Sequence, residues 1–112
     1  MNKDTIYYSL SKLNKIANGN AHFIDKMIQL FIDTTPADIK NMRNHFKMGK
    51  YGEVSQIAHK LIPSIDLICT KPLVEEIRKI EAIEKNSASI SESEIEATLS
   101  KIEIAISQLK SR

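Results

Sequence analysis

Apolar residues recur at intervals of three and four positions along almost the whole chain, which is the spacing of helices that bury one face. No run alternates apolar and polar residues for more than a few positions, as a half-buried strand would. Only three glycines and three prolines occur among the 112 residues, so few positions force a helix to stop. The pattern predicts an all-α protein, an antiparallel up-down four-helix bundle with a short additional N-terminal helix.

Capping residues divide this pattern into six predicted helices. Asn18-Gly19-Asn20 closes the first helix, which includes Ile6. Thr35 suits an N-cap and Pro36 a first helical position, so we expect the second helix to stop near Asp33 and a third to begin there. Ser91 and Glu94 match a capping box ahead of the last helix. The predicted helices cover about 6–17, 23–31, 36–46, 53–68, 70–80 and 92–109, with a polar connection over 87–91.

Length and composition limit the classes of protein to which the chain can belong. The 112 residues are enough for one domain, 1–112, with a core over about 20–110. The 16 basic and 14 acidic residues are spread evenly, which argues against a nucleic-acid partner. No segment approaches ~20 consecutive apolar residues, and the N-terminus lacks the features of a signal peptide. Cys69 is the single cysteine. We therefore expect a monomeric, cytoplasmic protein without membrane insertion or an internal disulfide.

The predicted helix over 53–68 carries the residue of greatest functional interest, His59. At about 100° per residue, His59 lies about 140° from the middle of the apolar stripe, so it points outward. On this geometry alone, a surface histidine without a role is the simpler explanation. Gly52, Gln56, Pro63 and Asp66 share its face, and Ser55 and Ile62 lie at the edge of that face.

The residues around this histidine resemble a known phosphorylation motif. Ala58-His59-Lys60-Leu61 followed by Ser64 is similar to Ala-His-x-Leu-Lys-Gly-Ser, the site of the histidine-containing phosphotransfer (HPt) family. The resemblance extends over roughly residues 20–110. It implies a phosphorelay carrier that accepts and donates a phosphoryl group on His59. The partner would be the receiver domain of a response regulator or hybrid sensor kinase, which supplies Mg²⁺ and the catalytic groups. The chain itself would be no enzyme and would need no cofactor.

Two positions depart from the family motif. Ile62 stands where the family has a lysine that neutralises the phosphate, and Pro63 stands where it has a glycine that gives a receiver room to approach. Pro63 cannot donate to the carbonyl of His59, so we expect a kink in this helix. The departures leave open a non-phosphorylated helical adaptor that binds a signalling partner. They also fit a carrier whose docking surface, around Ile62 and Pro63, is more apolar.

Cations near His59 would have to replace the missing lysine. Lys60 is adjacent but about 100° around the helix. Lys40 and Arg43 would lie level with His59 on an antiparallel neighbour, where either a phosphate contact or a solvated charged face is equally plausible. His22 and His45 are weaker candidates for chemistry. No Gly-rich phosphate loop occurs, and the scattered histidines match no metal-site spacing, so neither ATP nor a metal is expected.

Overall fold

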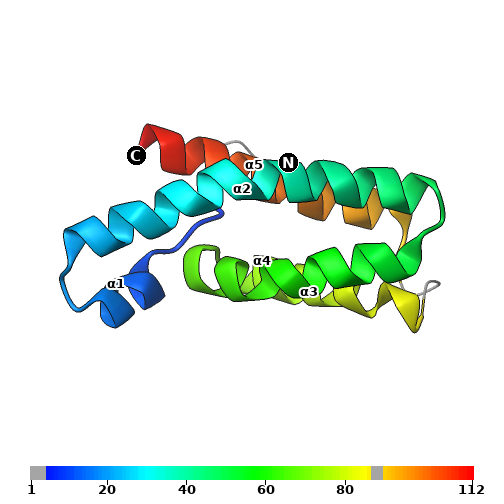
Figure 1. Cartoon of the computed structure of the whole chain (residues 1–112), viewed down its shortest axis with the longest axis horizontal. Coiled ribbons are helices and arrows are strands. Elements are labelled where there is room, and N and C mark those ends of the chain that lie inside the picture. Colours follow the sequence, from blue (N-terminus) through cyan, green and yellow to red (C-terminus); the bar gives the residue numbers. More distant parts are fainter. Residues whose placement is uncertain (1–4, 87–89) are drawn as a thin grey trace.

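A computed structural model describes residues 5–86 and 90–112, and this part of the chain is all-α. Its one extended contact is an isolated antiparallel bridge between Tyr8 and Cys69. The predicted all-α class is confirmed. Part of the predicted connection over 87–91 lies outside the described residues. The elements are α1 (Ser11–Ala17), α2 (Ala21–Lys47), α3 (Tyr51–Ile68), α4 (Lys71–Glu81), the 3-10 turn η1 (Ala82–Glu84) and α5 (Glu92–Ser111) (Figure 1).

The first half of the chain contains one long helix where the sequence predicts two. Helix α2 runs for 27 residues straight through Pro36, and Thr35 is a core residue, 1% exposed, instead of an N-cap. The buried stripe of Phe31, Thr35 and Ile39 continues across the proline, whose ring is on the exposed side. An interior proline costs ~3 kcal/mol, but each large apolar side chain on this stripe contributes about 1.5–3 kcal/mol when buried. Packing on both sides therefore keeps the helix continuous.

The N-terminal segment before α1 is extended, so the predicted helix over 6–17 is shorter than expected. Ser9 N–H donates to the carbonyl of Ile68 (2.8 Å), and Thr70 N–H donates to the carbonyl of Tyr7 (3.1 Å). The Gln108 side chain of α5 accepts from Tyr7 N–H (3.0 Å) and donates to the carbonyl of Thr5 (2.6 Å). These bonds satisfy the backbone without a helix and tie the segment to α3 and α5.

Helices that are adjacent in sequence pack against each other, and α5 closes the structure. Figure 1 shows α2 beside α5 and α3 beside α4, and contacts also join α2 to α3 and α4 to α5. Gly49, at φ 73°, makes the turn after α2. The chain then runs back along α2, as two contacts between α2 and α3 show. His45 Nδ1 lies 2.9 Å from Glu53 Oε2, and Lys60 Nζ lies 3.2 Å from Asp38 Oδ1.

The buried apolar side chains form one cluster, which includes Leu13 of α1. The predicted capping box of Ser91 and Glu94 is confirmed, since each side chain bonds to the other's backbone N–H. None of the described helices is long and apolar enough to cross a membrane. The inward stripes predicted for the last two helices are also confirmed, with burial of Leu73, Val74, Ile77, Ile80, Ile95, Leu99, Ile102, Ile106 and Leu109.

Candidate functional site

His59 lies in the middle of α3, and its side chain is 80% exposed. The outward position predicted from the sequence is therefore confirmed. The neighbouring residues Ala58 and Leu61 are buried, so the helix turn that carries the histidine is anchored to the core. Helix α3 continues without interruption through Pro63, which is exposed and has no N–H to offer the carbonyl of His59. The imidazole is thus presented to solvent from a firmly packed helix.

A carboxylate from the next helix holds one nitrogen of this imidazole. Nδ1 of His59 is hydrogen-bonded to Oε2 of Glu81, the last residue of α4. A carboxylate accepts only, so the neutral ring donates through Nδ1–H and carries its lone pair on Nε2. The pairing selects one tautomer and leaves Nε2 as the nucleophilic nitrogen.

The backbone around Glu81 is fixed against α3 by three further contacts. The hydroxyl of Ser55 donates to the carbonyl of Glu81, and Ile83 in η1 is completely buried. The carboxylate of Glu84 lies over Gly52, where a Cβ would approach Glu84 Oε1 to 3.2 Å. A glycine at position 52 therefore lets η1 pack closely on the start of α3. These contacts fix the backbone position from which the Glu81 side chain extends to His59.

An open groove of about 490 Å³ runs beside His59, between α3 and the η1 turn. Lys85 is the only cation among the described residues that line the groove, and it lies outside the motif around His59. The turn at residues 69–70 makes α3 and α4 antiparallel and places residues 81–85 level with residues 55–59. The number of residues on each side of this turn could therefore have indicated that Glu81 and Lys85 lie near His59. The groove is lined by Ser55, Gln56, His59, Glu81, Ala82, Glu84 and Lys85.

The basic edge predicted on α2 does not reach His59. Arg43 faces α5, where its guanidinium bonds to Glu96 (2.7 Å) and Glu103 (2.8 Å). These carboxylates raise the pKa of Arg43, and Arg43 lowers the pKa of Glu96. Arg43 is therefore engaged with two carboxylates of α5, and its contacts lend no support to the predicted phosphate contact, which stays a prediction. Lys40 is exposed and is not among the residues that line the groove.

The other candidates from the motif are divided between surface and core. Lys60 reaches toward α2, where it pairs with Asp38, whereas the carboxylate of Glu81 approaches His59 from α4. Pro63 and Ser64 are exposed. Ile62 is only 8% exposed, so its predicted place on an outward docking surface is wrong. Helix α3 packs against both α2 and α4, which widens its buried face beyond the stripe that the spacing indicates.

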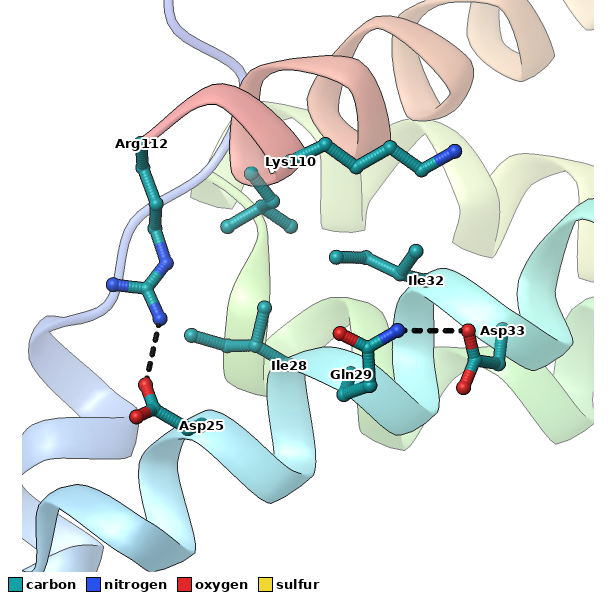
Figure 2. Close-up of a pocket in the computed structure, with 8 residues that line it drawn as sticks. Asp25, Ile28, Gln29, Ile32, Asp33, Lys110 and Arg112 are labelled. Atoms are coloured by element: carbon teal, nitrogen blue, oxygen red, sulfur yellow. Dashed lines mark hydrogen bonds and ion pairs between the residues drawn. The ribbon is translucent and has the colours of Figure 1, made fainter.

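A second hollow lies between α2 and the C-terminal end of α5 (Figure 2). Its carboxylates are already engaged, since Arg112 bonds to Asp25 (2.9 Å) and Gln29 bonds to Asp33 (2.9 Å). None of its lining residues is a histidine, cysteine or serine. With both of its carboxylates engaged and no histidine in its lining, this hollow offers no counterpart to His59, and we assign the candidate site to the groove beside His59.

The described residues contain no group of three or more histidine, cysteine, aspartate or glutamate side chains that could hold a metal ion. Comparisons with protein-family models, with curated proteins and with solved structures found no match to this chain. Functional assignment therefore depends on the chemistry of the site and on the motif around His59.

Proposed function

We propose that this protein is a phosphorelay carrier of the HPt type, which accepts a phosphoryl group on His59 and passes it to a receiver-domain aspartate. The observation that carries the proposal is the exposed imidazole in mid-helix whose Nδ1 is held by Glu81. The contacts among α2, α3, α4 and α5 support an antiparallel up-down four-helix bundle as the scaffold. Ala58-His59-Lys60-Leu61 and Ser64 supply the motif.

The pairing suits the chemistry of transfer. The lone pair of His59 Nε2 attacks the phosphorus of a receiver acyl phosphate, and the N–P bond forms as the P–O bond to the aspartate breaks. The aspartate leaves as a carboxylate with the bonding electron pair. The proton stays on Nδ1, so the phosphorylated ring becomes cationic, and the carboxylate of Glu81 stabilises that charge.

The carrier itself needs little catalytic machinery. Phosphoryl transfer depends mainly on positioning and on charge compensation at the phosphorus, and the receiver domain would supply its own Mg²⁺ and aspartate. On this proposal the chain is a transfer intermediate, not an enzyme. It would work as a cytoplasmic monomer whose partner belongs to a response regulator or a hybrid sensor kinase.

The direct test is incubation with a ³²P-labelled phosphorylated receiver domain, followed by assay for protein-bound phosphate that is labile in acid and stable in base. We expect labelling of the wild-type protein and none of His59→Gln. His22→Gln and His45→Gln are matched controls that should label normally, because neither residue lines the groove. Labelling that persists in His59→Gln, or wild-type protein that several receivers fail to label, would refute the proposal.

A second candidate is a helical adaptor that binds a partner without phosphorylation. The groove holds two carboxylates, Glu81 and Glu84, which disfavour a dianionic group on His59. An adaptor would bind its receiver with the same affinity in wild type and His59→Gln, while neither protein acquires acid-labile phosphate. Calorimetry and the labelling assay together therefore separate the two functions.

A further inference from the structure

Phosphorylation of His59 would bring several negative charges close together in the groove. The phosphoryl group carries close to two negative charges, and the groove already contains the carboxylates of Glu81 and Glu84. The position that offers a lysine in the HPt motif is the buried Ile62 here. A carrier with this site therefore needs a cation from another part of the chain.

The nearby cations differ in how far they are already engaged. Lys60 is paired with Asp38 toward α2, and Arg43 is bound by two glutamates of α5. Lys85 is exposed and lines the same groove as His59. Within residues 5–86 and 90–112, its ammonium group makes no hydrogen bond or ion pair. Lys85 is thus the cation that is both close to His59 and free to bind an anion.

The backbone at Lys85 is held in place, although its side chain is exposed. Lys85 N–H donates to the carbonyl of Ala82 (3.1 Å), which closes the η1 turn. The preceding residues anchor this turn on α3, through the buried side chain of Ile83 and the contact of Glu84 with Gly52. The long lysine side chain therefore starts from a fixed point at the rim of the groove.

We propose that Lys85 is the phosphate-binding residue of this site and that it donates hydrogen bonds to the phosphoryl oxygens carried on His59 Nε2. This inference rests on the proposed carrier function. Glu81 and Lys85 then act on opposite ends of one group: Glu81 binds the protonated Nδ1, and Lys85 binds the dianionic phosphoryl group. Lys85 keeps all its protons and forms no covalent bond.

Phosphoramidate is the probe, because it tests the site without any receiver domain. Its P–N bond breaks as the bond from phosphorus to His59 Nε2 forms, and the nitrogen leaves as ammonia. ³¹P NMR then measures the rate of phosphohistidine formation, its half-life, and the pH at which the phosphoryl group titrates. The proteins are wild type, Lys85→Gln, Lys85→Arg and Lys79→Gln. Lys79 is a matched control, since it is exposed near the same end of α4 but lines a different hollow, toward α5.

We expect Lys85→Gln to form phosphohistidine about threefold to fivefold more slowly, the scale of one solvent-exposed ion pair. Its phosphoryl group should also titrate at higher pH than in wild type, because the dianion loses a neighbouring cation. Lys85→Arg should restore both values in large part, and Lys79→Gln should match wild type. Circular dichroism checks that all four proteins are folded.

Two outcomes overturn the proposal in distinguishable ways. If wild type is labelled on His59 while Lys85→Gln has the same rate and the same titration, the phosphate-binding role fails and the carrier function stands. If wild type acquires no phosphohistidine from phosphoramidate or from receivers, both fail together. An equal loss in Lys79→Gln would show a general effect of charge, which also contradicts a specific role for Lys85.

Discussion

The carboxylate of Glu81 bonds to Nδ1 of His59 across the interface between α3 and α4. The two residues are 22 positions apart in the sequence, and they meet because the turn at 69–70 brings the end of α4 back to the middle of α3. The pair makes the reactivity of an exposed side chain depend on the packing of two helices. A change that shifts α4 along α3 would therefore alter the reactivity of His59 without any substitution at His59 itself.

Glu81→Ala is expected to slow phosphorylation of His59 by about tenfold, because the ring loses both its preferred tautomer and the stabilisation of its positive charge. Glu81→Gln should be less affected, since its amide oxygen still accepts from Nδ1–H. Quench-flow labelling with a phosphorylated receiver measures both rates. Glu75→Ala is the control, because Glu75 is exposed on α4 and does not line the groove. Equal rates for Glu81→Ala and wild type would contradict the proposed role.

Ile62→Glu is expected to lower the free energy of unfolding by about 2–4 kcal/mol, because it places a charge at a position that the structure buries. Ile62→Val removes one methylene group and should cost only about 0.5–1.5 kcal/mol. Urea denaturation followed by circular dichroism measures both values. An unchanged midpoint for Ile62→Glu would mean that the side chain is at the surface, as the spacing alone suggests.

Pro63→Ala is expected to stabilise the fold by about 1–2 kcal/mol. Alanine supplies the N–H that the carbonyl of His59 lacks, which removes most of the ~3 kcal/mol helical cost of proline, and part of the gain is offset by a more flexible unfolded chain. Pro36→Ala in α2 offers a parallel case, because that proline is also exposed within a continuous helix. Urea denaturation checks both variants, and a loss of stability in Pro63→Ala would show that the ring packs against something essential.

Arg43→Ala is expected to cost about 0.5–1 kcal/mol at pH 7, a modest value because the side chains of Glu96 and Glu103 are about half exposed to solvent. Arg43 lowers the pKa of Glu96 in the folded protein, so this contribution is present above the unfolded pKa of about 4.3. It should disappear as the pH falls through the lower, folded pKa. The stabilities of wild type and variant should therefore converge as the pH falls from 7 through the folded pKa of Glu96, and a stability difference that does not change with pH would rule out this electrostatic origin.

The helix pattern and the exposure of His59 could be predicted because both depend on local periodicity. The stripes of α4 and α5 and the cap at Ser91 follow from residues that are close in sequence. The predicted helix break at Thr35–Pro36 was wrong. Burial of side chains on both sides of the proline outweighed the local signals for a helix start. Propensity measures the cost of a residue in a helix, whereas tertiary packing decides whether that cost is tolerated.

The predicted site was least accurate where it depended on neighbouring helices. The burial of Ile62 reflects two helices that flank α3, and the direction of Arg43 reflects carboxylates 53 and 60 residues away. Glu81 and Lys85 carry no motif of their own, and only the geometry of the α3–α4 pair gives them a place beside His59. A single helix can show which face is exposed but not which partners the neighbouring helices present.

The contact between the extended segment before α1 and Cys69 makes this cysteine a reporter of local opening. Cys69 is 5% exposed, burial raises the pKa of its thiol to about 12, and Tyr8 bridges to its backbone. A thiol reagent needs the thiolate and access to the sulfur, so we expect modification to require opening of the region where residues 5–10 meet the end of α3. The rate of Cys69 modification under native conditions thus measures how often this end of the molecule opens, independently of global unfolding.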